Sequence, residues 1–539
     1  MQHVTCNLQH FIKSLLLITL FGCQPVKTTF IKKTDFKHYI DEFNRQDTLN
    51  LHFNVIPGTE MISNEDTWDF LKDNIPFLEC PDKEIEEIYY YRWWTFRKHI
   101  KNTPDGYVIT EFMPNVPWAE KYNTIPCPAG HHFREGRWLH NPEIIRDYGL
   151  FWLRGGGNPY RYSFWISDSF IRYHMVHKDN SLLVDVLPDL IANFHEWEER
   201  RLDSSGLFWQ YDGQDGMEVA IGGHGLRPTI NTYMWADAVA LSEIAAIAGE
   251  EYAVSGQQYA AKAKEIKEKV LSTLWDEEDL FFKVMPRGTD SLSSARELLG
   301  YVPWYLGMVP PGNGYEVAWK QLMDPQGFYA PFGPTTAEQR HPGFRVSYEG
   351  HECQWNGPSW PFATSQTLTA LANVLNDYPQ DIISKDNFFK LLKIYTNSHR
   401  FRQIPPEADT IISNQPWIDE NLNPFNGDWL ARTRMEVQGY NNRFRERGIY
   451  YNHSTFNDII ITGLAGLRPS LENAITVNPL IPEDWDWFCL DNILYKGRII
   501  TILWDRTGKK YGKGRGLRLY SDGKLLAKSR NLGKLEVQL

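Results

Sequence analysis

Two loops that lie far apart in the sequence carry the residues best suited to proton chemistry. Residues 209–218 combine aromatic residues and glycines with several carboxylates, and residues 417–428 form a second acidic stretch. Hydrolysis of a glycosidic bond needs a proton for the departing oxygen and a carboxylate that attacks or activates water. The two loops therefore indicate a glycoside hydrolase, with Asp215 as the general acid and Glu420 as the general base.

The proposed acid must hold a proton near neutral pH. A free aspartate titrates near pH ~3.9, so Asp215 needs either burial or a neighbouring negative charge. Trp209, Tyr211 and Met217 would supply burial, and Asp212 or Glu218 would supply the like charge. Asp212 and Glu218 are also alternatives to Asp215 as the acid. A further alternative is that Asp215 only caps its loop between glycines.

The proposed base must stay ionised. Arg432 and Arg434, together with Asn421 and Asn423, are the nearby residues that we expect to hold the Glu420 carboxylate and a water molecule. The alternative is an exposed acidic turn without a catalytic role.

Composition narrows the class of protein. The chain has 20 Trp, 27 Tyr and 29 Phe, whose flat rings suit stacking on sugars, although a helical core rich in aromatic residues explains the same counts. The net charge of -11 argues against nucleic acid or an anionic membrane surface as the main partner. Neither His131-His132 nor His351-Glu352 has the spacing of a zinc site, so we expect no metal and no cofactor.

The N-terminus resembles an export signal. A short apolar run, residues 15–21, is followed by Cys23 in a sequence that resembles the lipobox of bacterial lipoproteins. We therefore expect residues 1–23 to be a signal peptide and Cys23 to be lipidated, which would place the protein in the periplasm or at the outer membrane. An ordinary secretory signal with an incidental cysteine is the alternative. The spacing of the remaining cysteines predicts no particular disulfide.

Most of the chain has the periodicity of helices separated by tight turns and aromatic extended steps. This repetition is typical of stacked helical hairpins, and about twelve helices close most economically into an (α/α)6 toroid. A short strand over 107–112 and a polar aromatic loop over 130–139 are expected before the main helical part. The predicted helices are 83–100, 148–152, 162–177, 182–202, 229–249, 251–275, 313–323, 359–377, 385–398 and 454–467.

The sequence pattern changes after Pro469, where short alternating apolar runs are separated by turns such as Asp522-Gly523. We interpret residues 471–539 as a small antiparallel β domain of sandwich type. Residues 24–65 are interpreted as a tether and N-terminal extension, and residues 66–470 as the toroid. The chain is thus expected to be mainly α, and most economically a monomer.

Several segments resemble glycoside hydrolase family 63 and the related mannosylglycerate hydrolases. Residues 419–428 look like the family segment whose leading glutamate is the general base, which here falls on Glu420. Residues 355–361 and 451–455 resemble two further segments of the group, and Asp215 falls where the group has its acid. The resemblance covers roughly residues 80–470 and implies an (α/α)6 barrel and an inverting mechanism.

An inverting enzyme holds its two carboxyl groups about 6.5–9.5 Å apart with water between them. A pocket-shaped toroid also suggests cleavage at chain ends, so we expect exo-action on an oligosaccharide or glycan side chain. The residues that we expect to line the sugar pocket are Arg92, Trp138, Arg227, Asn231, Trp355 and Tyr451.

Two other functions fit parts of the sequence. A polysaccharide lyase on a similar toroid would use Tyr451 and His453 on uronic acids. A helical, aromatic-rich lipoprotein of the SusD type would bind glycans without cleaving them. The paired acids in separate motifs favour the hydrolase.

Overall fold

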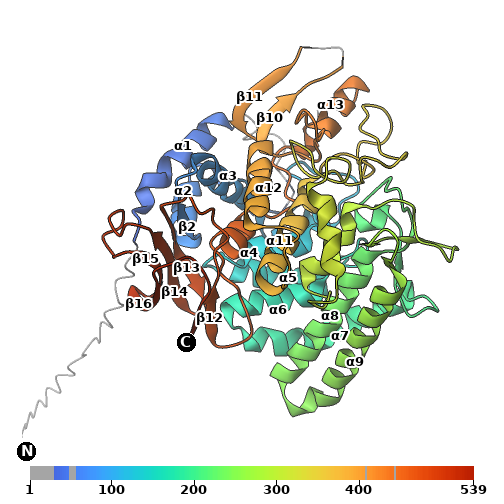
Figure 1. Cartoon of the computed structure of the whole chain (residues 1–539), viewed down its shortest axis with the longest axis horizontal. Helices are drawn as coiled ribbons and strands as arrows, with labels where there is room; N and C mark the ends of the chain where they lie inside the picture. Colours follow the sequence, from blue (N-terminus) through green and yellow to red (C-terminus); the bar gives the residue numbers. More distant parts are fainter. Residues whose placement is uncertain (1–29, 48–55, 57, 407–408, 442–444) are drawn as a thin grey trace, which may run out of the picture.

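A computed structural model describes residues 30–47, 56, 58–406, 409–441 and 445–539. In Figure 1 a large helical body, coloured cyan to orange, lies beside a smaller β domain in dark red. Among the described residues no helix is long and apolar enough to cross a membrane. The predicted signal peptide and Cys23 lie outside the described residues.

The helical body is built around a closed inner ring of helices. Each inner helix contacts the next one along the chain, and the last contacts the first. The ring therefore closes on itself rather than forming an open solenoid. Its members are α4 (Ala129–Gly136), α6 (Ile166–His177), α8 (Pro228–Ala248), α10 (Val302–Leu306), α11 (Pro361–Asp377) and α15 (Asn457–Ile459), which continues as the π-helix η8 (Ile460–Leu464).

An outer helix alternates with each inner helix along the sequence, and its exposed face meets solvent. Together the two layers form the (α/α)6 toroid that the helical repetition predicted, and this prediction of fold class is confirmed. The outer helices are α3 (Lys83–His99), α5 (Glu143–Arg154), α7 (Asn180–Arg201), α9 (Ala253–Thr273), the 3-10 helix η6 (Tyr315–Met323) and α12 (Lys385–Ser398).

Local sequence signals fix where many of these helices begin. The Asp82 carboxylate accepts two backbone N–H groups in the first turn of α3. Ser384 and Asn387 form a reciprocal capping box at the start of α12. Pro228 and Pro361 stand in the first turns of α8 and α11, where a missing N–H costs no helical hydrogen bond. Local chemistry therefore explains why the predicted bounds are close to those observed.

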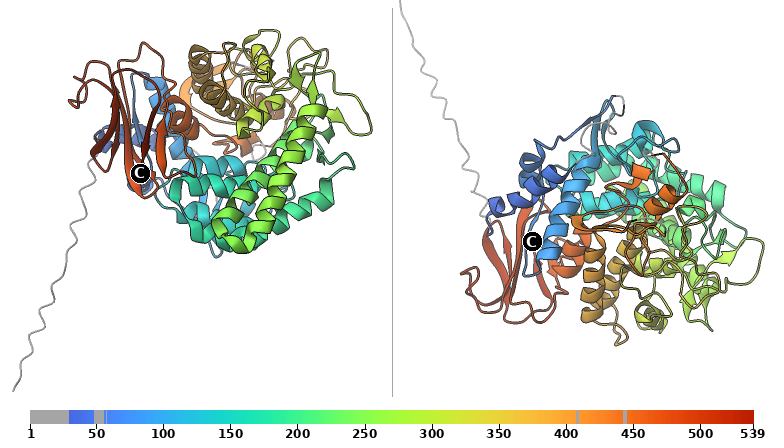
Figure 2. Two further views of the ribbon diagram at one scale, coloured as in Figure 1. Left: turned by 60° about the horizontal axis from the view of Figure 1, so that its bottom comes forward. Right: turned by 90° about the horizontal axis from the view of Figure 1, so that it is seen from above.

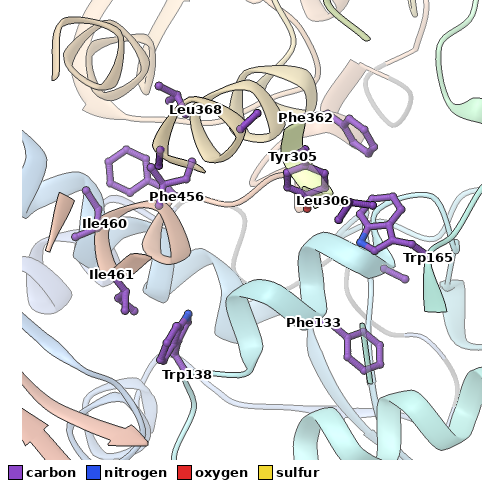
Figure 3. Close-up of a cluster of buried hydrophobic side chains, with 14 of the residues drawn as sticks. Phe133, Trp138, Trp165, Tyr305, Leu306, Phe362, Leu368, Phe456, Ile460 and Ile461 are labelled. Carbon is purple, nitrogen blue, oxygen red and sulfur yellow. The ribbon is translucent and has the colours of Figure 1, made fainter. Parts of the chain in front are cut away.

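Large apolar side chains fill the interior of the ring. Figure 3 shows Phe133 of α4, Tyr305 of α10 and Phe362 of α11 converging from different inner helices. Trp165 lies between Phe362 and Phe133 in this view, Phe456 lies on the other side of Tyr305, and both are fully buried. Burying one such side chain stabilises a fold by roughly 1.5–3 kcal/mol, so this cluster holds the ring together.

The segment 130–139 corrects one prediction, because it is mostly the inner helix α4 and not a loop. Two glycines obscured the helical pattern. A Cβ on Gly130 would lie 2.1 Å from the Trp165 ring, and one on Gly136 would lie 2.2 Å from Ile145. The glycines allow α4 to approach its neighbours closely, a packing requirement that outweighs their poor helix propensity.

The C-terminal residues form the antiparallel β domain that was predicted. Figure 2 shows its strands against one side of the toroid. A second pair, β12 (Ala474–Val477) with β17 (Leu535–Gln538), packs beside the main sheet. The main sheet has the order β16 (Lys524–Ser529), β15 (Gly516–Ser521), β14 (Arg498–Asp505), β13 (Trp487–Tyr495) and β2 (Phe77–Glu79).

Strand β2 comes from the N-terminal side of the toroid, so the sheet draws on residues outside 471–539. The helices α1 (Lys37–Gln46) and α2 (Thr67–Asn74) contact α3. Asp491 of β13 accepts hydrogen bonds from the backbone N–H groups of Phe30 and Ile31. The N-terminal extension is thus packed against both the toroid and the β domain.

The loops between helices carry short regular elements. The 3-10 helices are η1 (Lys33–Phe36), η2 (Lys121–Asn123), η3 (Gly213–Asp215), η4 (Glu250–Tyr252), η5 (Leu298–Tyr301) and η7 (Glu446–Gly448), and α13 (Leu430–Val437) is one further helix. The short strands are β1 (Glu60–Met61), β3 (Ile100–Thr103), β4 (Gly106–Ile109), β5 (Trp209–Gln210), β6 (Gly225–Leu226), β7 (Trp275–Asp276), β8 (Phe281–Phe282), β9 (Met285–Pro286), β10 (Arg400–Gln403) and β11 (Ile411–Pro416).

Candidate active site

A cavity of about 220 Å³ opens at one rim of the toroid. The segments that line it precede the inner helices α4, α6, α8, α11 and α15, so all of them lie at the N-terminal ends of inner helices. Loops held by a rigid scaffold are a common place for binding and catalysis. The lining residues are Glu111, Phe112, Trp118, Ile125, Cys127, Tyr162, Gly216, Glu218, His351, Glu352, Cys353, Trp355, Trp360, Phe362, Glu420, Arg447, Tyr451 and His453.

Glu420 lies at the bottom of this cavity, with 1% of the residue exposed. Its carboxylate receives two hydrogen bonds from Arg447, 2.8 Å from Nε to Oε1 and 3.0 Å from Nη2 to Oε2. Such a forked contact between a guanidinium and a carboxylate fixes the orientation of the acid and stabilises its ionised form. The structure thus places the predicted base where it can meet a ligand.

Arg447 is a residue that the sequence analysis missed. Its Nη1 atom donates to Glu352 at 3.1 Å, and its guanidinium lies over the Trp118 ring. The segment 442–447 has no motif that marks it, and only the proximity of Tyr451 in the sequence hints at a role.

The arginines that we expected beside Glu420 have other partners, which corrects that prediction. Arg432 is paired with Asp419 at 2.9 Å and with Glu446. Arg434 donates to the backbone carbonyls of Ser347 and of other residues in the loop that carries Glu352. It therefore holds the cavity rim in place without touching the base.

Glu218 is the second carboxyl of the site. Burial, followed by the negative charge of Glu420, raises the pKa of Glu218 to about 8. Its backbone carbonyl accepts the N–H of Trp355 at 3.0 Å, which ties the loop to the opposite wall. Gly216 ends η3 with φ +70°, and a Cβ there would lie 2.4 Å from Cys127 Sγ. This turn directs the chain so that Glu218 reaches the cavity.

Glu111 is a third carboxyl at the cavity, and nothing in the sequence singled it out. Its Oε1 atom accepts a hydrogen bond of 2.7 Å from the Tyr451 hydroxyl. Burial, and then the charges of Glu420 and Glu218, raise the pKa of Glu111 to about 8 despite this hydrogen bond. The cavity therefore combines two carboxyls that favour the protonated form with one that is ion-paired.

Asp215, the predicted acid, does not line the cavity. Its side chain is fully buried, with Oδ2 2.7 Å from Arg227 Nε and hydrogen-bonded by the Thr229 hydroxyl. The Arg227 side chain is fully buried as well. This buried ion pair connects η3 to the beginning of α8, and Asp215 is not among the residues that line the cavity.

Replacing Asp215 with Asn is expected to destabilise the protein by about 3–5 kcal/mol, because Arg227 would remain buried without its counter-charge. Urea unfolding of the purified variant measures this loss. Asp381, at an exposed position, supplies the control, and D381N is expected to unfold like the wild type. Wild-type stability of D215N combined with loss of hydrolysis would instead restore Asp215 as the acid.

Three other predicted pocket residues also lie outside the cavity and support the fold. Arg92 is buried and donates to the Ser454 carbonyl at 2.6 Å. Trp138 donates its indole N–H to Asp458 at 2.7 Å, and Asn231 accepts the Phe208 N–H at 2.7 Å. With Arg227 engaged by Asp215, these positions do not line the cavity, because their polar groups already satisfy buried partners.

Trp355 and Tyr451 do lie in the cavity wall, as predicted. Trp355 stacks on Trp360 with ring centres 4.6 Å apart and an interplanar angle of 13°. The ring of Tyr451 lies 4.0 Å from that of His453, whose Nε2 is 3.2 Å from the Glu420 carbonyl oxygen. The segments 355–361 and 451–455 thus meet around the base although they are far apart in the sequence.

The described part of the chain contains no group of three or more His, Cys, Asp or Glu side chains arranged to hold a metal ion. Cys80, Cys127, Cys353 and Cys489 are free thiols. The Cys353 sulfur lies 4.0 Å from Glu420 Oε2, and burial raises the pKa of this thiol well above its ordinary value.

A closed (α/α)6 ring, a cavity at its rim with paired carboxyl groups, and an attached β domain together define a glycoside hydrolase of the toroid class. The chain belongs to the mannosylglycerate hydrolase MGH1-like glycoside hydrolase family, whose profile matches residues 121–454. Residues 467–527 match the C-terminal domain of glycosyl hydrolase family 65. The predicted enzyme class and the predicted family resemblance are thereby confirmed.

One solved structure gives the same picture of the fold. A protein named "Sialidase" is 41% identical, with a TM-score of 0.85 over 94% of this chain. This chain spans only 45% of that protein.

Two further solved structures are more distant. The GH63 mannosylglycerate hydrolase from Thermus thermophilus in complex with glucose is 10% identical, with a TM-score of 0.47 over 64% of this chain and 98% of its own. The GH78 family rhamnosidase of a Bacillus species is 12% identical, with a TM-score of 0.49 over 80% of this chain and 40% of its own.

Proposed function

We propose that this glycosidase removes a terminal sugar with inversion, using Glu218 as the general acid and Glu420 as the general base. One observation carries the proposal. Two carboxyl groups line one cavity in contrasting environments: burial raises the pKa of Glu218, and Glu420 is held in a forked ion pair with Arg447. Environments that drive two acids apart in this way assign the donor and the acceptor of protons.

The proposed reaction uses each group once. The Glu218 carboxyl gives its proton to the glycosidic oxygen as the bond to the anomeric carbon breaks. Glu420 takes a proton from a water molecule, whose oxygen forms the new bond on the opposite face of the sugar. The products are an alcohol and a free sugar of inverted configuration. Glu218 then leaves the cycle ionised and Glu420 protonated, and exchange of protons with solvent restores both.

The charges in the cavity favour an uncharged sugar. Among the described residues that line it, Arg447 is the only lysine or arginine, and it is already engaged by Glu420 and Glu352. Burial and the nearby charge of Arg92 hold the pKa of His453 well below its ordinary value. An anionic sugar would therefore meet carboxyl groups without a free cation to balance it.

The size of the cavity supports removal of single terminal residues. Its volume of about 220 Å³ is below the roughly 300–1,000 Å³ usual for ligand pockets. Aromatic rings at Trp118 and Trp355 would contact the apolar faces of one sugar ring. We therefore propose exo-action on an oligosaccharide or a glycan side chain.

The lyase alternative is not favoured by the cavity. Burial, followed by the charge of Glu111, raises the pKa of Tyr451 far above its ordinary value, so the phenol is a poor base. Its hydroxyl is also committed to Glu111 as a donor. A lyase would need a positive group to bind the uronate carboxyl. Arg447 is already paired with Glu420 and Glu352 and does not supply one. Non-catalytic capture of glycans does not account for the paired carboxyl groups.

A screen of neutral aryl glycosides and oligosaccharides tests the proposal. The purified protein is incubated with each compound, and proton NMR follows the first anomer that is released. Release of one monosaccharide with inverted configuration supports the proposed function. A retained anomer, or unsaturated uronides as the products, would exclude it.

Activity is expected to fall at alkaline pH. The acid form of Glu218 is required, and its pKa of about 8 means that kcat/KM should decrease tenfold per pH unit above about pH 8. Because the raised pKa belongs to the acid, the loss occurs as pH rises and not as it falls. A pH profile of the wild type measures this limb. An alkaline limb that stays in place in E218Q would show that another group causes it.

Lipidation of Cys23, a location in the periplasm or at the outer membrane, and a monomeric state remain proposals from the sequence. Cys23 lies outside the described residues.

A further inference from the structure

Glu111 occupies a position at the cavity floor that the proposed reaction does not use. Only 5% of the residue is exposed, and it follows β4 closely in the sequence. Its backbone carbonyl accepts the Asn452 N–H at 3.0 Å, and its Oε1 atom accepts the Tyr451 hydroxyl at 2.7 Å. Two contacts from the segment before α15 therefore fix both the backbone and the carboxyl group.

The second carboxyl oxygen of Glu111 is left for a ligand. Within the described part of the chain no lysine, arginine or histidine hydrogen-bonds to it, and Glu111 lines the cavity. The charged or titratable groups around Glu111 are Tyr451, Glu218, Glu420, Arg447, Cys127, Tyr148 and Tyr162. Because Arg447 is engaged by Glu420, no cation neutralises Glu111, and a protonated carboxyl can donate one hydrogen bond into the cavity.

Glu111 is not placed to act as the leaving-group acid. Its carboxyl accepts the Tyr451 hydroxyl, and Glu111 is more deeply buried than the partly exposed Glu218. In the proposed reaction the sugar that is cleaved off lies on the deeper side of the acid. A fixed donor that is buried more deeply than Glu218 therefore meets that sugar and not the leaving group.

We propose that Glu111, oriented by Tyr451, hydrogen-bonds a hydroxyl group of the uncharged sugar at the cavity floor and so selects sugars that carry this hydroxyl. The inference rests on the proposed function, since it names a specificity residue for the same cavity. Glutamine in place of Glu111 keeps a donor of nearly the same shape, whereas alanine removes it.

The test uses direct binding so that it does not depend on turnover. Methyl glycosides of neutral sugars, and the monodeoxy forms of the best binder, are titrated calorimetrically into E218Q protein, which lacks the acid. The same titrations are made with E111Q and E111A in the E218Q background. Glu135 provides a matched control, because it is also buried but accepts the backbone N–H groups of Asn457 and Asp458 outside the cavity.

E111A is expected to weaken binding by about 10- to 100-fold, as for one lost hydrogen bond to a sugar hydroxyl, and E111Q by less than about tenfold. One monodeoxy sugar should bind equally to proteins with and without Glu111. The control E135Q should lower thermal stability and leave the dissociation constant unchanged. Equal binding of every sugar to E111A would overturn the proposal even if the wild type hydrolyses glycosides.

Failure of the proposed function looks different. Sugar binding that depends on Glu111, without any hydrolysis by the wild type, would leave the Glu111 site standing and refute the hydrolysis scheme. A wild-type cavity that binds none of the neutral sugars would contradict both.

A second readout needs no ligand. Glu111 has a pKa of about 8 when folded and near ~4.3 when unfolded, so the folded state binds the extra proton and loses stability as pH rises between these values. E111Q should therefore lose less thermal stability than the wild type between pH 5 and pH 8.5. An identical decline in both proteins would mean that Glu111 is already ionised and cannot donate.

Discussion

Replacing Glu218 or Glu420 with Gln is expected to lower kcat by about 10²–10⁴-fold, the usual contribution of a general acid or base. Both side chains line the same cavity, and the substitutions keep their shape while removing the proton transfer. The measurement is steady-state hydrolysis of the aryl glycoside identified by the screen. E349Q, at an exposed position in the loop that carries Glu352, should keep wild-type kinetics.

The two variants should differ in their response to the leaving group. The dinitrophenolate of a dinitrophenyl glycoside leaves without needing a proton. E218Q should therefore recover most of its activity on this substrate. E420Q should not recover, because activation of water is still missing. Equal losses of activity on substrates with good and poor leaving groups in E218Q would show that Glu218 is not the acid. A wild-type rate in E420Q would show that Glu420 is not the base.

Substitution of Arg447 by Met is expected to lower kcat nearly as much as the substitutions of Glu218 and Glu420. Glu420 would lose its forked contact and remain almost fully buried, where burial favours the protonated form of a carboxyl. The base would then lack the contact that orients it and stabilises its ionised form, and kcat should fall by about 10²–10⁴-fold. Stability should also drop by about 3–5 kcal/mol, because one member of a buried ion pair is removed.

The pH profile distinguishes this effect from simple misfolding. In R447M the residual activity should rise with pH relative to that of the wild type, because Glu420 has lost the partner that stabilises its ionised form. R447K keeps a positive charge but loses the planar fork, so an intermediate rate is expected. Wild-type kcat in a folded R447M protein at pH 6 would show that the ion pair does not prepare the base.

The helical scaffold was largely readable from the sequence because its signals are local. Capping groups such as Asp82 and Ser384, and prolines in first turns, set helix starts within a few residues. The main exceptions are short helices that tertiary contacts stabilise. The helix α4 was predicted as a loop, since its glycines serve close packing against Trp165 and hide the apolar pattern.

The proposed base was also accessible from the sequence, because residues 419–428 form one continuous motif around Glu420. The acid that we propose from the structure was not. Asp215 and Glu218 are three positions apart in the same loop, and both have burial and acidic neighbours in the sequence. The difference between them is that Arg227 and Thr229, from the start of the next helix, bind Asp215 inside the protein.

The closed helical ring, the β domain and the two loops at its rim could be inferred from the sequence, because periodicity, caps and contiguous motifs are properties of neighbouring residues. Which carboxyls face the cavity, and which partners they have, depends on the folded structure. Arg447 reaches Glu420 across 27 positions, and Tyr451 reaches Glu111 across 340. Burial and partner charge control protonation, and both are set by residues that the fold brings together from distant parts of the chain.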